Sequence, residues 1–141
     1  MKNKFVFIAS WTESIIHFRG DLVKQVLEAG FEVHFIAPFL PVDATVRDQL
    51  KLKGVTCHPV KFDRGSVNPF RDILLFIKLF RVIKEIKPEY VFSYTIKPVI
   101  YGSLAAFLAR VPKIYSLITG LGLTFNNSGL ARTLVRQIAS V

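Results

Sequence analysis

The stretch Phe5-Val6-Phe7-Ile8-Ala9-Ser10 is a continuous apolar run of strand length. Unbroken apolar character is typical of a strand covered on both faces of a sheet, since a half-exposed strand alternates instead. Residues 20–29 then carry apolar side chains at helical spacing, and Gly30 stands just past them, where a left-handed cap is easiest for glycine. This pattern predicts the first strand and helix of an α/β fold.

The same alternation continues along the chain. Further strands are expected at residues 32–37, 55–60, 89–93 and 113–118, with helices at 45–53, 69–87 and 98–109. Asn68 before Pro69 favours a helix start, because asparagine accepts a first-turn N–H and proline loses no bond there. Strands that alternate with helices predict a mainly parallel, Rossmann-like sheet with helices on both faces.

The length of 141 residues indicates a single domain. Residues 130–141 have a helical pattern with no cap after it, so we expect the N-terminal part of a longer protein. The single cysteine, Cys57, excludes an intrachain disulfide framework and favours a reducing compartment. No apolar stretch approaches the roughly 18–20 residues of a membrane span, so a cytosolic protein is expected.

Basic side chains concentrate in the second part of the sequence. The formal net charge is +9, and residues 61–141 hold twelve Lys or Arg against four Asp or Glu. No carboxylate side chain follows Glu89. Such a balance indicates an anionic partner: nucleic acid, acidic lipid headgroups or a phosphorylated small molecule.

Ligands of open α/β sheets bind beyond the carboxyl ends of the strands. The loops expected there carry four cations and four glycines, which together predict a phosphate or diphosphate site: Arg19, Lys61, Arg64, Lys97, Gly20, Gly65, Gly120 and Gly122. A dinucleotide site is disfavoured, because the turn after the first strand has no glycine before Gly20. No His/Cys pair has zinc spacing, so no metal is expected.

The helix expected at residues 69–87 has apolar residues in two groups. One group is Ile73, Phe76, Ile77, Phe80 and Ile83, and the other is Leu75, Leu79, Val82 and Ile86. Lys78, Arg81 and Lys84 form a narrow strip between them. The helix either packs between the sheet and a neighbouring helix with a charged rim, or rests with a basic, apolar surface on an anionic bilayer.

Several motifs together resemble the N-terminal domain of glycosyltransferase family 4. They are Tyr94-Thr95-Ile96-Lys97-Pro98-Val99-Ile100-Tyr101-Gly102-Ser103-Leu104-Ala105-Ala106, Val111-Pro112-Lys113, Ile118-Thr119-Gly120-Leu121-Gly122, His17-Phe18-Arg19 and Arg64-Gly65-Ser66-Val67-Asn68-Pro69. The resemblance covers nearly the whole chain. It is greatest to enzymes that extend polyprenyl-diphosphate-linked sugars for O-antigen, capsule and bacterial N-glycan assembly.

The resemblance implies a GT-B enzyme, in which two Rossmann-like domains face each other across a cleft. Residues 1–141 would be the acceptor-binding domain, and a C-terminal domain outside this chain would hold the nucleotide-sugar, which is expected to be a UDP-sugar. Transfer to a lipid-linked acceptor would retain the sugar's configuration and need neither metal nor cofactor. The enzyme would lie peripherally on the inner face of the bacterial cytoplasmic membrane.

The resemblance also implies roles for particular residues. Gly120 and Gly122 would line the cleft, Thr95 and Lys97 would face it, and Arg19 and Arg64 would hold acceptor phosphate. His17 departs from the asparagine that is commoner in relatives, so no catalytic role is assigned to it, and no residue is assigned as the base.

Two other functions stay open on the residues alone. One is a non-catalytic basic α/β module that binds anionic membrane or nucleic acid, with the interleaved apolar residues favouring lipid over nucleic acid. The other is an epimerase or dehydrogenase, which the missing glycines of the first turn disfavour.

Overall fold

The computed structural model describes residues 3–17, 19–62 and 68–118 of the chain. Strands and helices alternate through these residues. The elements are β1 (Lys4–Ile8), α1 (Ser14–His17), α2 (Gly20–Glu28), β2 (Glu32–Ala37), η1 (Pro41–Asp43), α3 (Ala44–Leu52), β3 (Thr56–Pro59), α4 (Pro69–Ile86), β4 (Tyr90–Tyr94), η2 (Pro98–Gly102), α5 (Ser103–Leu108) and β5 (Lys113–Leu117).

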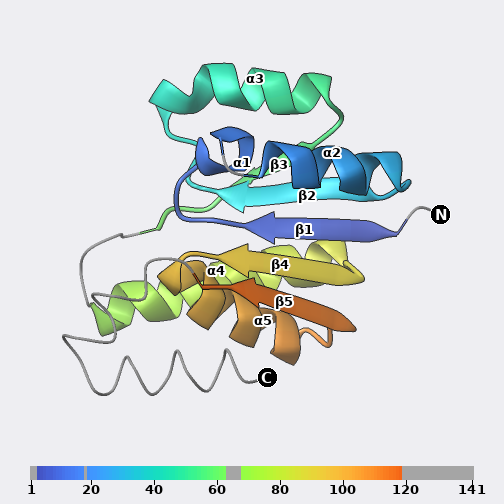
Figure 1. Ribbon diagram of the computed structural model, residues 1–141. Helices are drawn as coiled ribbons and strands as arrows, with labels where there is room; N and C mark the ends of the chain where they lie inside the picture. Colours follow the sequence, from blue (N-terminus) through green and yellow to red (C-terminus); the bar gives the residue numbers. More distant parts are fainter. Residues whose placement is uncertain (1–2, 18, 63–67, 119–141) are drawn as a thin grey trace.

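The five described strands form one parallel sheet in the order β3-β2-β1-β4-β5. Helices α2 and α3 lie on one face and α4 and α5 on the other (Figure 1). The chain therefore runs outward from β1 to one edge, crosses to β4 and runs outward again. This Rossmann-like arrangement confirms the expected fold class.

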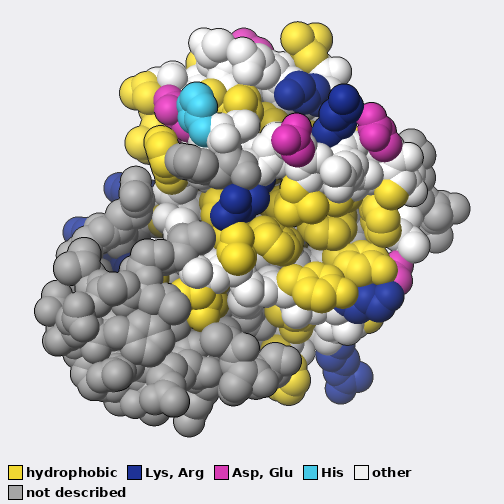
Figure 2. Space-filling view, viewed as in Figure 1, with side chains coloured by type: hydrophobic (Ala, Val, Ile, Leu, Met, Phe, Trp, Pro, Cys, Tyr) yellow, Lys and Arg dark blue, Asp and Glu magenta, His cyan; other side chains and the backbone are white. Residues whose placement is uncertain are grey.

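The alternation of side chains along the central strands builds a core on each face of the sheet. Phe5, Phe7 and Phe35 pack with α1, α2 and α3, whereas Val6, Ile8 and Ile36 pack with α4 and α5. Over β4 and β5, hydrophobic side chains remain exposed on the face that carries α2 (Figure 2). Tyr115 and Leu117 of β5 belong to this exposed area.

Most predicted bounds agree with the structure to within a residue or two. Helix α4 begins after Asn68, whose side chain accepts from the amides of Phe70 and Arg71 at 3.1 and 3.4 Å. Gly30 follows α2 with φ +93°, as the predicted left-handed cap requires. The short helix α1 lies between the predicted first strand and first helix and was not predicted. The segment expected as one helix over residues 98–109 begins with a π-helical turn, η2.

Of the two alternatives for α4, packing through both apolar groups is wrong for part of the helix. Leu75, Leu79, Ile83 and Ile86 are buried against the sheet. Ile73 and Ile77, assigned to a packing face, are 56% and 38% exposed. The reason is that α4 packs beside η2 and α5, whereas its opposite flank faces solvent. That flank carries Phe70, Ile73, Leu74, Ile77, Lys78, Arg81 and Lys84, all exposed, and is called the α4 outer surface.

Among the residues that the structure describes, no helix is both long enough and apolar enough to cross a bilayer.

Candidate functional site

The candidate site lies where the chain changes direction in the sheet. Strands β1 and β4 are neighbours, but the chain leaves β1 toward β2 and leaves β4 toward β5. The loops at their carboxyl ends therefore diverge. This is the position at which open α/β sheets bind ligands in a crevice, and it is called the β1–β4 crevice here. Arg19 and Thr95 lie at this edge.

Arg19 joins the two diverging loops. It is the N-cap residue of α2, and its guanidinium carbon lies 5.1 Å from the centre of the Tyr94 ring, at the end of β4. Burial raises the pKa of Tyr94 to about 12, against smaller lowering effects of a hydrogen bond to Ser14 and of the Arg19 charge. The phenol therefore stays protonated at neutral pH, and the cation stacks on a neutral ring.

Thr95 turns the chain from β4 into the helical segment that follows. Its φ is +70°, a left-handed conformation that is uncommon for a β-branched residue. Its Oγ1 lies 3.0 Å from Oγ of Ser10, the second residue after β1. The backbone outlier and the hydroxyl pair thus both stand at the point where the two loops diverge.

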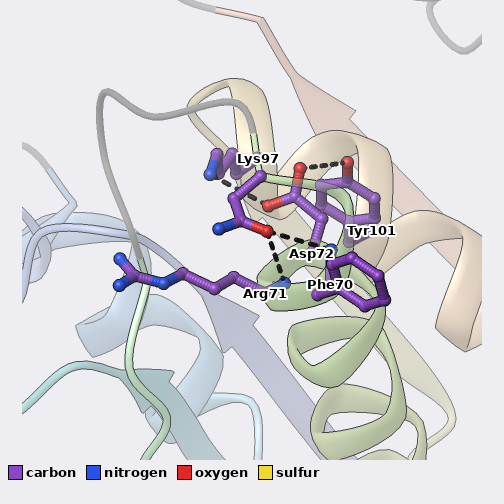
Figure 3. A network of polar contacts seen from close by, with 6 residues as sticks. Phe70, Arg71, Asp72, Lys97 and Tyr101 are labelled. Atoms are coloured by element: carbon purple, nitrogen blue, oxygen red, sulfur yellow. Dashed lines mark hydrogen bonds and ion pairs between the residues drawn. The ribbon is translucent and has the colours of Figure 1, made fainter.

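Lys97 is held by an acidic residue of α4 (Figure 3). Its Nζ lies 3.1 Å from Asp72 Oδ1, and Tyr101 donates its hydroxyl to Asp72 Oδ2 at 2.9 Å. The Lys97 and Asp72 side chains are only 19% and 13% exposed. Burial, the hydrogen bond to Asp72 and the Asp72 charge together raise the pKa of Tyr101 to about 12, so the phenol remains a donor.

This network has two consequences for the site. Much of the positive charge of Lys97 is compensated by Asp72, and the first turn of α4 is tied to the start of η2. Sequence reasoning missed Asp72 and Tyr101. The available signal was an acidic residue in the first turn of a helix with a clear Asn68-Pro69 start, where carboxylates are favoured.

Beside Asp72, three cations surround a pocket of about 230 Å³. Lys61 follows β3, and Arg71 and Lys78 come from α4; Leu74 and Leu75 complete the lining with Asp72. Lys61 was among the cations expected at this edge. The pocket shows that three cations gather around the N-terminal half of α4, next to the Asp72 that holds Lys97.

The predicted site residues therefore divide into three groups. Arg19, Thr95 and Lys97 are brought to the same edge of the sheet, since β1 and β4 are adjacent and parallel. Lys78, Arg81 and Lys84 lie on the α4 outer surface rather than between two packed faces. Arg64, Gly120 and Gly122 lie outside the described residues.

The histidines lie away from this crevice or at its exposed margin. His17 Nε2 is 3.7 Å from Glu13 Oε2, and both side chains are well exposed. His34 bonds to both Glu32 and His58 within the β2–β3 half of the sheet. Within residues 3–17, 19–62 and 68–118, no three His, Cys, Asp or Glu side chains gather as metal ligands would.

Comparison with known proteins adds a family assignment to this geometry. Residues 7–140 match the family described as glycosyl transferase 4-like. A curated relative from Campylobacter jejuni, N,N'-diacetylbacillosaminyl-diphospho-undecaprenol alpha-1,3-N-acetylgalactosaminyltransferase, is 32% identical over 132 residues, which are 94% of this chain and 34% of the relative. The chain spans about a third of the length of the curated relatives that it matches.

Solved structures share the fold. MurG of Acinetobacter baumannii has a TM-score of 0.59 at 23% identity, over 80% of this chain and 34% of that one. A UDP-N-acetylglucosamine 2-epimerase has a TM-score of 0.64 at 18% identity, over 100% of this chain and 41% of that one. Because proteins with different names share it, the fold alone does not select a reaction.

Proposed function

The chain belongs to the glycosyl transferase 4-like family, as its motifs predicted, and from that premise we propose that it is the acceptor-binding domain of a glycosyltransferase. The whole enzyme transfers a sugar from a nucleotide-sugar, a UDP-sugar in our proposal, to a saccharide carried on a polyprenyl diphosphate. The observation that carries this proposal is the relative named for a diphospho-undecaprenol acceptor, which aligns with 94% of the chain.

The crevice between the β1 and β4 loops suits an anionic acceptor. Arg19 stands at its edge on the ring of Tyr94, and we assign it to the acceptor phosphate, together with Arg64. Thr95 and Lys97 face the same crevice, and Gly120 and Gly122 complete its lining in this proposal. Because Asp72 already compensates Lys97, Lys97 contributes a directed donor rather than a full free charge.

The reaction in this proposal retains the configuration of the transferred sugar and uses no resident metal. Positive charge from helix N-termini and basic side chains stabilises the departing diphosphate. The base that deprotonates the acceptor hydroxyl stays unassigned.

The α4 outer surface supports a peripheral position on the cytoplasmic membrane, in surface-polysaccharide assembly of the capsule or O-antigen kind. Phe70 is 80% exposed and Leu74 58% exposed, and Lys78, Arg81 and Lys84 lie on the same side of the helix. Apolar residues among cations suit the interface of an anionic bilayer. The same helix borders the site through Asp72, so docking would bring a lipid-linked acceptor near the crevice.

A transfer assay on the full-length protein tests this function. The purified enzyme is incubated with labelled UDP-sugars and an undecaprenyl-diphosphate-linked saccharide, and the anomeric configuration of the product is read by NMR. We expect transfer with retention of configuration. In Arg19→Ala, kcat/KM should fall roughly 10–100-fold, because losing a hydrogen bond to a charged group costs a free energy that corresponds to this change in rate.

Lys24→Ala is the matched control, because Lys24 is an exposed cation of the same helix α2. It should leave transfer unchanged. Absence of turnover across a broad donor and acceptor panel would contradict the proposal. Salt-dependent binding to anionic vesicles without any turnover would support the non-catalytic module instead.

A further inference from the structure

We propose that three buried hydroxyl side chains, Ser10, Thr12 and Ser14, form a clamp that positions the acceptor site by fixing the loops after β1, β2 and β4 to one another. The inference rests on the proposed function for what the site binds, but the clamp itself is a property of the described residues. These residues are positioning residues, because they act through the loops that they hold.

Each of the three hydroxyls reaches a different point on a neighbouring loop. Ser10 Oγ lies 3.0 Å from Thr95 Oγ1, just beyond β4. Thr12 Oγ1 accepts from the Phe39 amide at 3.0 Å, in the loop after β2. Ser14 Oγ lies 2.9 Å from the Tyr94 hydroxyl at the end of β4. One five-residue segment thus holds two other loops.

Two of the partners are held in an unfavourable backbone conformation. Thr95 has a φ of +70° and Phe39 a φ of +46°, where residues with a Cβ pay a steric cost. Such conformations persist only where surrounding contacts over-determine them, and they gather at functional sites. The clamp supplies a contact at each of these two positions.

The clamp hydroxyls are nearly inaccessible to solvent. Ser10, Thr12 and Ser14 are 7%, 1% and 3% exposed. A buried hydroxyl costs free energy unless it is hydrogen-bonded. Breaking one of these bonds would therefore destabilise the loops, because little water reaches the hydroxyls to replace the lost partner. The loop that lacks the glycines of a dinucleotide site is therefore fixed by these side chains.

The position of Arg19 depends on this arrangement. Ser14 begins α1, which leads directly to Arg19, and the same Ser14 side chain bonds to the Tyr94 hydroxyl. Arg19 in turn stacks on the Tyr94 ring. The clamp consequently positions both Arg19 and the Tyr94 ring. Loosening it would displace Arg19, the residue proposed to bind the acceptor phosphate.

Variants of the Ser10–Thr95 pair test the clamp in the full-length protein. Thr95→Val removes the hydroxyl but keeps the branched shape, Ser10→Ala removes its partner, and Thr95→Ser restores a hydroxyl. We expect the KM for the undecaprenyl-diphosphate-linked acceptor to rise about tenfold or more in the first two, with an unchanged KM for the UDP-sugar. The double variant should be no worse than either single one.

Ser103→Ala is the matched control, since Ser103 and Ser116 form a similar hydroxyl pair at 2.8 Å between α5 and β5. It should leave both KM values unchanged. A merely structural role would lower the active fraction, and so kcat, without changing the acceptor KM. Unchanged acceptor KM in both Thr95→Val and Ser10→Ala would overturn the inference.

A second measurement is independent of turnover. Trp11 lies inside the clamp segment and is the single tryptophan of these 141 residues. In protein labelled with 5-fluorotryptophan, the ¹⁹F resonance that disappears in Trp11→Phe belongs to it. This resonance should shift or broaden in Ser10→Ala and Thr95→Val but not in Thr95→Ser or Ser103→Ala. An unchanged resonance in the first two variants would overturn the clamp, even if the protein transfers no sugar.

Discussion

Gly102 brings η2 into close contact with the sheet. A Cβ placed there would lie 3.0 Å from Cδ1 of Ile8 and 3.0 Å from Oγ of Ser93, both in central strands. We expect Gly102→Ala to lower the free energy of unfolding by about 1–3 kcal/mol, the usual cost of overpacking a core. Urea denaturation measures this loss.

Gly20 offers the matched comparison for that variant. A Cβ at Gly20 would meet only the Ile15 carbonyl oxygen, at 4.0 Å. Gly20→Ala should therefore be neutral or slightly stabilising, because alanine favours a helix over glycine. Equal losses at both positions would show that close approach to the sheet is not the cause.

The Glu32–His34–His58 chain of side chains has one consistent proton arrangement when both rings are neutral. An ionised carboxylate only accepts, so His34 donates Nε2–H to Glu32 Oε1, 2.8 Å away. Its Nδ1 then accepts from Nε2 of His58 at 2.9 Å. Adding a proton to both rings would place two donors against each other and break the bond between the histidines.

This chain predicts a loss of stability in mild acid. Burial, and next the neighbouring His34, lower the pKa of His58 below its ordinary 6.5, with Glu85 acting weakly in the opposite sense. The unfolded chain then takes up a proton at higher pH than the folded one. The contribution is present above pH 6.5 and is lost as the pH falls through the folded pKa of His58.

Urea denaturation between pH 8 and 5 measures this slope. His58→Asn should flatten it, whereas Gln25→Asn should leave it unchanged, because Gln25 is an exposed residue of α2 that carries no titratable group. A slope of the same size in His58→Asn would assign the pH dependence to other groups.

At the scale of elements, α4 is tied to η2 by Asp72. We expect Asp72→Asn to lower the pKa of Tyr101 from about 12 toward its ordinary value of 10, since it removes the charge that opposes ionisation while burial remains. Titration of the tyrosine ring carbons by NMR measures the change. Asp21→Asn, at an exposed position of α2, is the control, and a Tyr101 pKa unaffected by Asp72→Asn would contradict the contact.

The sequence was sufficient to predict elements whose ends are marked locally. Asn68 and Pro88 bracket α4 and Gly30 ends α2, because capping depends on residues close in the chain. The partners of Asp72 could not be predicted, since Lys97 and Tyr101 are 25 and 29 residues away. The sequence left open whether the second flank of α4 packs or faces outward, because helical spacing gives the apolar positions but not which neighbour covers them.

For the whole molecule, charge and topology divide the sheet into two unlike sides. The crossover from β3 to β4 places α4 on the face opposite α2 and α3 (Figure 1). Residues 61–141, which include α4, hold twelve basic and four acidic residues. The α4 outer surface, which combines three cations with exposed apolar side chains, lies on this more basic part of the chain.

The last prediction concerns binding of the whole protein to membranes. Changing Lys78, Arg81 and Lys84 together to Glu should weaken binding to phosphatidylglycerol vesicles roughly hundredfold or more, since each cation near an anionic surface contributes about 1 kcal/mol. The matched control changes Lys24, Lys51 and Lys53 to Glu, which alters net charge equally on exposed residues of the opposite face. Vesicle sedimentation at fixed salt measures both. Equal weakening in the two variants would attribute binding to the total charge of the protein. Unchanged binding in the first variant would show that α4 does not dock on the membrane, because a docked surface must lose affinity when its own cations are reversed.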